Sequence, residues 1–278
     1  MSNVMSTPAA SSLTRLEYRA ATMRFADRHG SALTAVRDVS FSVGDGEIVS
    51  LIGPSGCGKS TLLNIGSGLT MPSDGAALVD GERVTGPNAH VAFMLQKDLL
   101  LPWRTIAENV MFGVEIQKVP LSERRGRAQS LLKKFNLAEF AAHYPHQLSG
   151  GMRQRVALAR TLAVNPHVLL LDEPFSAVDA QTRIVLQRDL ARTLAESGKT
   201  ALLITHDLLE AVTLSDRVLV MSRRPGTIVE EIAIDMPRRD DPIARRADPK
   251  VNDYLARLMD RLDIAHASLE RETAGDAG

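Results

Sequence analysis

Eight residues in the first quarter of the chain have the composition and spacing of a phosphate-binding loop. They form GPSGCGKS over residues 53–60, after the apolar run EIVSLIG and at the start of a helix-forming segment. Glycines let consecutive backbone N–H groups curl around phosphate oxygens, and the helix start adds its positive dipole end. Lys59 then reaches the β- and γ-phosphates of a nucleotide, and the Ser60 hydroxyl is placed for Mg²⁺. The residues expected to contact the nucleotide are Gly53, Pro54, Ser55, Gly56, Cys57, Gly58, Lys59, Ser60 and Thr61.

Two adjacent carboxylates follow a strongly apolar segment later in the chain. The run VLLLDEP places Asp172 at the end of a strand and Glu173 directly after it. In a protein with a phosphate-binding loop, the strand-end aspartate holds Mg²⁺, and the neighbouring glutamate orients or deprotonates the attacking water. Because side chains alternate in direction along a strand, the two carboxylates should diverge toward these two tasks. His206 ends the run ALLIT in the same way, and either bonds the γ-phosphate or has a structural role.

A second candidate anion site lies in the stretch HQLSGGMRQRVALAR. Gly150 and Gly151 follow Ser149 at the start of a helix-forming run, so their amides are exposed at a helix N-terminus. If both anion sites served one nucleotide in one chain, residues 97–147 would have to fold back over the phosphate loop. Alternatively, two chains meet head to tail, each giving its glycines to the other's loop, as a twofold dimer allows. Residue spacing alone does not choose between these arrangements.

Buried strands alternate with helices along the chain, which predicts an α/β fold. The apolar runs in HVLLLDEP and TALLITHD are continuous, as in parallel strands covered on both faces. Polar residues at their C-terminal ends place the site along that edge of the sheet. Short β-patterned segments alternate with turns over residues 14–50, and the composition of residues 97–147 turns helical.

The two ends of the chain are expected to lie outside the main domain. Residues 1–13 are small and polar and are expected to form a flexible tail, and the main domain covers residues 14–236. Residues 237–278 are expected to form a charged, proline-containing linker and a C-terminal helix. The apolar positions of that helix share one face, namely Val251, Tyr254, Leu255, Leu258 and Leu262. Because these positions share one apolar face, we expect the helix to pack against its own domain or a paired subunit rather than to have a regulatory role.

Composition excludes several classes of protein. Lys and Arg together number 33, as do Asp and Glu, so nucleic acid is not expected as the main partner. The single cysteine, Cys57, excludes an intrachain disulfide and favours a reducing compartment, where we expect it to fill space in its loop. No signal peptide or membrane-spanning run is evident. We therefore expect a cytoplasmic protein that contacts a membrane only through a partner.

Taken together, the motifs resemble those of the ATP-binding subunit of an ABC transporter. The motifs are GPSGCGKS, Gln96, LSGGM, LLLDEP, SAVD and His206, and the resemblance extends over roughly residues 16–232. It implies an α/β fold with a RecA-like P-loop NTPase core, an antiparallel β subdomain and an inserted α-helical subdomain over about residues 97–150. It also implies hydrolysis of ATP with Mg²⁺ in a sandwich of two ATPase chains, which are either two copies of this chain or this chain and a different ATPase. In that sandwich, Ser149 and Gly151 contact the γ-phosphate bound by the partner, and Asp179 lies at the dimer interface.

The resemblance also implies roles for two further positions. Gln96 links the nucleotide to the helical subdomain and touches both Mg²⁺ and the attacking water. The family's adenine-stacking aromatic best matches Phe25, with Tyr18 as the alternative. Phe25 stands where tyrosine is commoner, and SAVD where SALD is commoner, and neither change removes a functional group that the chemistry needs.

Finer resemblance comes from QKDLLLPWRTIAENV, DEPFSAVDAQTR and SRRPGTIVEEIAIDMPR, which are similar to the nitrate, sulfonate and taurine importer group. This implies a peripheral subunit on the cytoplasmic side of the inner membrane, with permease subunits as partners and a periplasmic solute-binding protein as an indirect one. Trp103 lies where this group grips the permease, although it could instead be a half-buried anchor of the helical subdomain. The alternative functions are an ABC exporter or lipoprotein-extraction ATPase, and an ABC ATPase that acts on nucleic acid or ribosomes.

Overall fold

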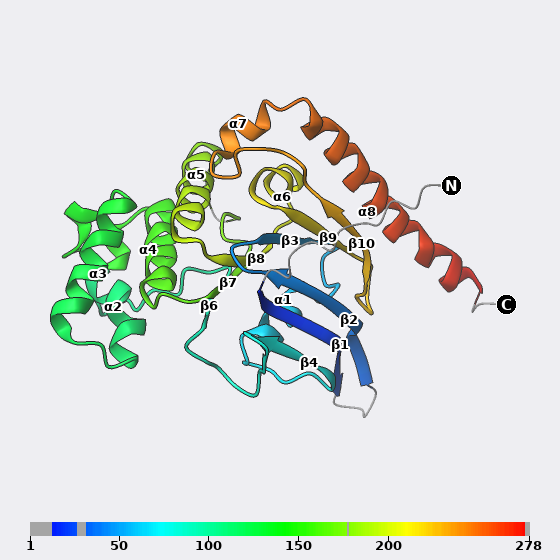
Figure 1. Ribbon diagram of the computed structural model, residues 1–278, viewed down its shortest axis with the longest axis horizontal. Helices are drawn as coiled ribbons and strands as arrows, with labels where there is room; N and C mark the ends of the chain where they lie inside the picture. Colours follow the sequence, from blue (N-terminus) through cyan, green and yellow to red (C-terminus); the bar gives the residue numbers. More distant parts are fainter. Residues whose placement is uncertain (1–12, 27–31, 177, 276–278) are drawn as a thin grey trace, which may run out of the picture.

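Two β-sheets and the helices that cover them form the chain, and the predicted α/β class is confirmed. The computed structural model describes residues 13–26, 32–176 and 178–275, with side chains as far as residue 262. Nearly all of the predicted tail therefore lies outside the described residues. Figure 1 shows the helices α2, α3 and α4 at one end of the molecule and the strands β1, β2 and β4 at the other side of the central sheet.

The central sheet has the strand order β10-β9-β3-β8-β7-β6. Neighbouring strands are parallel, except that β10 is antiparallel to β9. The runs VLLLD and TALLI form the predicted parallel strands β7 and β8, which pair with each other, and four residues of β7 and all five of β8 are buried. The strand bounds are β3 (Ile48–Ile52), β6 (Val91–Met94), β7 (Val168–Asp172), β8 (Thr200–Ile204), β9 (Arg217–Met221) and β10 (Ile228–Ala233).

A second, antiparallel sheet packs on one face of the first, with α1 (Lys59–Gly66) between them. Its order is β2-β1-β4-β5, with bounds β1 (Thr14–Ala26), β2 (Ala32–Gly44), β4 (Asp74–Val79) and β5 (Glu82–Arg83). Tyr18 of β1 is buried, and its hydroxyl donates a hydrogen bond of 2.7 Å to the carbonyl of Leu62 in α1. This contact joins the antiparallel sheet to the helix that follows the phosphate loop.

The helical subdomain consists of α2 (Ile106–Ile116), α3 (Leu121–Lys134) and α4 (Gly150–Ala163), with single turns η1 (Ala138–Phe140) and η2 (Pro145–Gln147). Helix α2 begins with a capping box, because Thr105 caps the amide of Glu108 and the Glu108 carboxylate caps the amide of Thr105. Apolar side chains of the three helices are buried together, among them Val110, Leu132 and Val156. The subdomain is therefore a packed unit that includes the helix starting at the two glycines.

Alternation along β7 explains how both faces of the central sheet are covered. Leu169 and Leu171 pack with the core of α2–α4 and α5 (Ala180–Ser197), whereas Val168 and Leu170 pack with α1 and the antiparallel sheet. A third core lies beside β9 and β10 and includes α6 (Leu208–Leu214). Among the helices that the structure describes, none is both long and apolar enough to cross a membrane.

The segment expected to be a linker contains a short helix, α7 (Pro242–Arg246), and is tied to the core. The guanidinium of Arg245 is buried and donates to the main-chain oxygens of Met236 (2.6 Å), Ser215 (2.8 Å) and Pro237 (2.9 Å). Composition alone could not indicate this, because a buried arginine that is satisfied by carbonyl oxygens has no sequence pattern.

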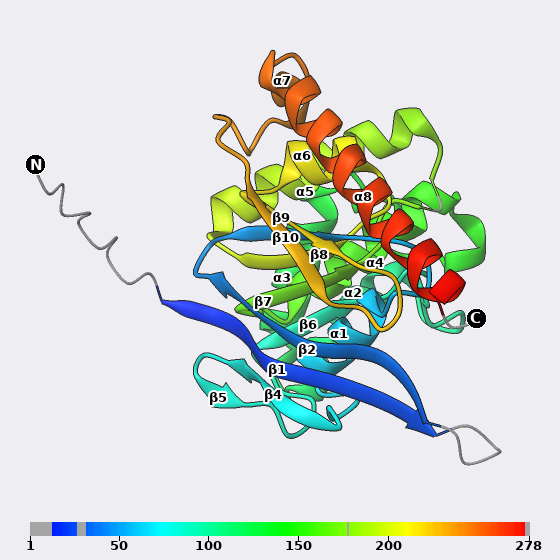
Figure 2. The ribbon, with the colours of Figure 1, turned by 90° about the vertical axis from the view of Figure 1, so that its right-hand side faces the viewer.

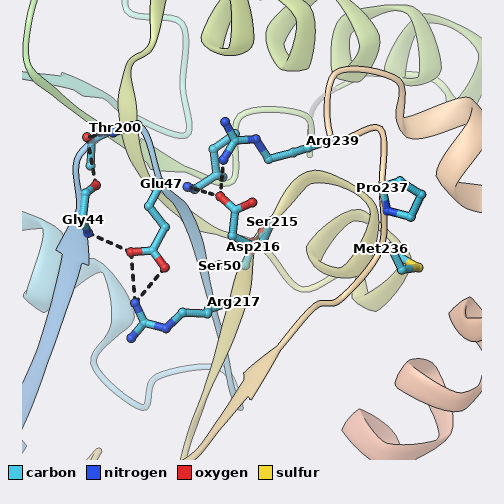
Figure 3. Close-up of polar contacts among 12 residues, drawn as sticks. Gly44, Glu47, Ser50, Thr200, Ser215, Asp216, Arg217, Met236, Pro237 and Arg239 are labelled. Carbon is cyan, nitrogen blue, oxygen red and sulfur yellow. Dashed lines mark hydrogen bonds and ion pairs between the residues drawn. The ribbon is translucent and has the colours of Figure 1, made fainter. Parts of the chain in front are cut away.

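Ion pairs and hydrogen bonds also connect the segment before α7 to the starts of β3 and β9 (Figure 3). Arg239 pairs with Asp216, whose carboxylate also accepts from the amide of Ile48 at 2.9 Å. Glu47 accepts from Arg217 at 2.8 Å and from the amide of Gly44 at 2.7 Å. These contacts fix the amino-terminal ends of β3 and β9, at the edge of the sheet opposite the phosphate loop.

The C-terminal helix α8 (Lys250–Gly275) packs its predicted face on α6 and β9 (Figure 2). Val251 and Leu258 are buried there, and Tyr254, Leu255 and Leu262 are partly buried against the same core. Of the two packing partners that the sequence left open, the structure shows this face on the helix's own domain.

Replacing Leu258 by alanine should lower the free energy of unfolding by about 2–5 kcal/mol, because the fully buried side chain would leave a cavity. The neighbouring Met259 is 55% exposed, so Met259→Ala should change the stability by no more than about 0.5 kcal/mol. Urea denaturation of both variants measures the difference. Equal midpoints for the two variants would show that α8 does not pack as described.

Candidate phosphate-binding and hydrolytic site

The phosphate loop connects β3 to α1 in a conformation that only its glycines allow. Gly56 and Gly58 have φ angles of +75° and +105°, in the region that L side chains rarely adopt. A Cβ atom at Gly58 would also collide with the side chain of Val36. Cys57 is buried, and burial raises the pKa of its thiol, which agrees with its expected role as a small loop residue.

Lys59 is the first residue of α1, and its side chain points back toward the start of the phosphate loop. Its Nζ donates to the carbonyl oxygens of Gly53 at 2.8 Å and Pro54 at 2.9 Å. The side chain is therefore held in the concave part of the loop, with only 8% of the residue exposed. A buried ammonium at a helix N-terminus is suited to bind an anion that brings more than one negative charge.

Ser60 and Asp172 form the second part of the site. The Ser60 hydroxyl is hydrogen-bonded to the Asp172 carboxyl, which lies at the carboxyl end of β7. Burial raises the pKa of Asp172 above its usual range, and the neighbouring Glu173 acts in the same direction. A cation beside this carboxylate would offset both effects, and an oxygen-only pair of ligands suits Mg²⁺. These residues therefore fit the metal that the motifs imply.

Glu173 is at the centre of the third part of the site. Its backbone has a φ of +46°, so the chain leaves the strand line directly after Asp172 and the two carboxylates diverge. Gln96 Nε2 donates to Glu173 Oε2 at 3.0 Å, and His206 Nδ1 lies 3.4 Å from the same oxygen. The structure thus brings together the ends of β6, β7 and β8, as the sequence predicts, and places two further expected site residues, Gln96 and His206, beside the Glu173 carboxylate.

The remaining expected contacts lie on a separate surface. Ser149 caps α4, accepting from the amide of Met152 at 3.3 Å, and Asp179 caps α5, accepting from the amide of Thr182 at 3.0 Å. The two helix starts adjoin, because a Cβ atom at Gly151 would lie 2.5 Å from the Thr182 side chain. Gly150 and Gly151 therefore start a helix of the helical subdomain, whereas Lys59 starts α1 beneath the central sheet (Figure 1).

The structure distinguishes the two candidate adenine-stacking aromatics. Tyr18 is 1% exposed, stacks on Phe41 within the antiparallel sheet, and cannot reach a ligand. Phe25 is 43% exposed near the end of β1. Of the two, only Phe25 has a face that a base could cover.

Arg224 contacts the phosphate loop and was not expected from the sequence. Its guanidinium donates twice to the carbonyl of Gly56, at 2.9 and 3.1 Å. It lies 168 residues after Gly56, beyond β9 and outside the motif GPSGCGKS. Only the parallel pairing of β3 with β9 brings it there, so no local signal in the sequence could have identified it.

Trp103 lies on a rigid, exposed turn between β6 and α2. It is 72% exposed, so it is not the half-buried anchor that the sequence allowed as an alternative. The turn is fixed by the buried amide of Asn109, which donates to the carbonyls of Leu101, Arg104 and Thr105. Leu99 is also exposed close by, so a preorganised apolar surface follows directly after Gln96.

The arrangement agrees with proteins of known sequence and structure. The family model described as ABC transporter matches residues 36–176. The taurine import ATP-binding protein TauB of Burkholderia pseudomallei is 45% identical over 242 residues, which cover 86% of this chain and 93% of TauB. The aliphatic sulfonates import ATP-binding protein SsuB 1 of Xanthomonas axonopodis pv. citri is 50% identical over 213 residues, or 76% of this chain and 84% of SsuB 1.

Solved structures extend the similarity to three dimensions. The dimeric structure of a post-hydrolysis state of the ATP-binding cassette MJ0796, bound to ADP and Pi, superposes with a TM-score of 0.71 at 32% identity. The match covers 80% of this chain and 99% of that one. The similarity first drawn from short motifs therefore extends over most of the chain.

Proposed function

The chain belongs to the ABC transporter family of ATP-binding subunits, and from that premise we propose that two copies of it power the import of a small sulfonate through a membrane permease. Its reaction is the hydrolysis of ATP. The hydrogen bond from Gln96 to Glu173 carries the proposal, because it joins the carboxylate beside the phosphate site to the exposed turn of Trp103.

Binding and hydrolysis of ATP use the residues around the phosphate loop. The loop amides and Lys59 hold the β- and γ-phosphates, and Phe25 stacks on the adenine. Ser60, Asp172 and Gln96 would hold Mg²⁺, which when bound neutralises charge on those phosphates. Glu173 aligns a water molecule in line with the bond that breaks. The water oxygen forms a bond to the γ-phosphorus while the bond between the γ-phosphorus and the bridging oxygen of ADP breaks. Glu173 accepts the proton that the water loses.

Each ATP is shared between two chains in this proposal. Ser149, Gly150 and Gly151 of one copy face the phosphates bound by the other, with Asp179 beside them at the interface. The adjoining starts of α4 and α5 support this, because they form one exposed surface apart from Lys59. His206 bonds the γ-phosphate. Its Nδ1 also lies close to Glu173 Oε2, so departure of the phosphate changes the surroundings of that carboxylate. Hydrolysis then reopens the pair.

The surface after Gln96 is proposed to transmit that motion to the permease. Asp98, in the same turn, is paired with Arg153 of α4 at 2.9 Å, and Arg160 of α4 donates to the carbonyls of Asp98 and Leu99. Movement of α4, which begins at the shared glycines, therefore displaces the turn that carries Trp103. This connection gives a physical route from the nucleotide to the partner.

The substrate class and location follow from the relatives. TauB and SsuB 1 are named for the import of taurine and of aliphatic sulfonates, which favours a small sulfonate over an exported substrate or nucleic acid. We place the chain on the cytoplasmic side of the plasma membrane, held there by permease subunits and served indirectly by a periplasmic solute-binding protein. An exporter or lipoprotein-extraction ATPase is the second candidate on the shared motifs alone.

Trp103→Ala should uncouple the subunit from its permease without altering its own hydrolysis. Removing a large, exposed aromatic from an interface centre should weaken the complex by about 2 kcal/mol, or roughly 30-fold. Val229→Ala, which removes an exposed apolar side chain on β10, is the matched control. The measurement is the ATPase rate of the reconstituted complex with and without a taurine-loaded binding protein.

We expect taurine to stimulate the wild-type and Val229→Ala complexes and to have little effect on the Trp103→Ala complex. Full stimulation of the Trp103→Ala complex would contradict the proposed contact between Trp103 and the permease. A complex that no sulfonate stimulates would contradict the substrate class.

A further inference from the structure

Three side chains from distant parts of the chain meet at the edge of the central sheet away from the phosphate loop. His167 Nδ1 lies 2.7 Å from Asp80 Oδ2, and His90 Nδ1 lies 3.1 Å from the same oxygen. The two Nδ1 atoms are 2.9 Å apart, and the ring planes are inclined by 79°. These three residues are the only such His, Cys, Asp or Glu group among the side chains that the structure describes.

Hydrogen bonding alone accounts poorly for this triangle. If both imidazoles donate to Asp80, two donors face each other across the third side at 2.9 Å. If one Nδ1 carries no proton, its lone pair faces either the other ring or the carboxylate oxygen, which is itself only an acceptor. A cation placed over the triangle attracts the lone pairs of all three atoms at once, which is the donor set of a metal site.

The dimensions suit a first-row transition metal. A centre equidistant from the three atoms lies about 1.7 Å from each in their plane, so an ion at the usual distance of about 2.0–2.1 Å lies roughly 1.2 Å above it. The triangle needs to open by only a few tenths of an ångström to reach tetrahedral ligand spacing. Two imidazoles and a carboxylate favour Zn²⁺ over Mg²⁺ or Ca²⁺, which prefer oxygen ligands.

Neighbouring residues hold the three ligands in place. Arg15 donates to the other oxygen of Asp80 at 2.7 Å, and Asp45 offsets the charge of Arg15 at 2.6 Å. Such outer contacts orient metal ligands in known sites.

The backbone and the local surface also suit a bound ion. The amide of His167 donates to the carbonyl of His90 at 2.8 Å, which fixes the two histidines side by side. A hollow of about 300 Å³ is lined by both Asp80 and His90, together with residues 82–88. It leaves room for water at a remaining coordination position.

We propose that Asp80, His90 and His167 bind a divalent transition-metal ion, with Zn²⁺ as the favoured ion. Asp80 follows β4 of the antiparallel sheet, whereas His90 and His167 precede β6 and β7 of the central sheet. The ion therefore fastens the two sheets together. It is distinct from the nucleotide site, because His167 and Asp172 flank β7 at opposite ends, about 16 Å apart.

Calorimetric titration of the chelator-treated, nucleotide-free protein with Zn²⁺ tests this proposal. We expect one ion per chain, a higher melting temperature on binding, and affinity more than about tenfold weaker in His90→Gln and Asp80→Asn. His90 is exposed, so its replacement should leave the fold intact. His146→Gln, at an exposed histidine elsewhere, and Asp172→Asn, in the nucleotide site, should bind Zn²⁺ as the wild type does.

Two results would overturn the proposal. One is the absence of saturable Zn²⁺ binding to the wild type. The other is Zn²⁺ binding that survives in His90→Gln and Asp80→Asn but is lost in Asp172→Asn, which would place the ion beside the phosphate loop. Co²⁺ in place of Zn²⁺ gives an independent readout, because its visible absorption reports the change of ligands directly.

Discussion

Glu173→Gln should lower the rate of ATP turnover by about 10²–10⁴-fold while ATP binding is retained, because the amide keeps the size of the side chain but cannot accept a proton. The structure places this carboxylate at the meeting point of Gln96 and His206, and directly beside Asp172. Glu173 also lies outside the phosphate loop, so its replacement leaves the contacts of Lys59 unchanged.

The measurement is steady-state ATPase activity together with equilibrium binding of a fluorescent ATP analogue. Glu139→Gln, at an exposed position of η1, is the matched control and should behave as the wild type. Wild-type turnover in Glu173→Gln would refute the assignment of this residue to the attacking water.

Lys59→Ala should remove hydrolysis and also weaken ATP binding, by at least about tenfold. The ammonium is the positive side chain that the structure places inside the phosphate loop, so its loss affects ground-state binding as well as the transition state. Glu173→Gln is different, because it affects only the chemical step. The two variants together therefore separate binding from chemistry.

Lys59 also holds its loop through Gly53 and Pro54, so a folding defect has to be excluded. Lys59→Met keeps most of the side-chain volume and should show the same loss of activity with a melting temperature close to that of the wild type. Lys133→Ala, an exposed lysine of α3, is the control for a change of net charge. Unchanged ATP affinity in both Lys59 variants would contradict the proposed site.

The sequence predicted the site well where function depends on short, continuous motifs. The order and chemistry of residues 53–60, Asp172, Glu173 and His206 predicted their meeting at one sheet edge, because the carboxyl ends of parallel strands align. The structure adds a left-handed backbone at Glu173, with a φ of +46°, which strand alternation does not predict. Alternation alone predicts the divergence but not the conformation.

Contacts between residues far apart in the sequence could not be predicted. Arg224 reaches Gly56 only because β9 pairs with β3, and Arg245 is buried only because α7 packs beside α6. Asp80, His90 and His167 have no motif spacing, and only the packing of two sheets brings them together. Pattern-based reasoning has no access to these positions until the strand order is known.

The solution mass of the Glu173→Gln protein, measured by light scattering with and without ATP and Mg²⁺, tests the shared-site proposal most directly. We predict a shift from one chain, of 30.2 kDa, to a dimer only when ATP is present, because each phosphate loop needs the glycines of a partner. ADP should leave the protein monomeric. A monomer under every condition, with ATP shown to be bound, would contradict a nucleotide shared between Lys59 of one copy and Gly151 of the other.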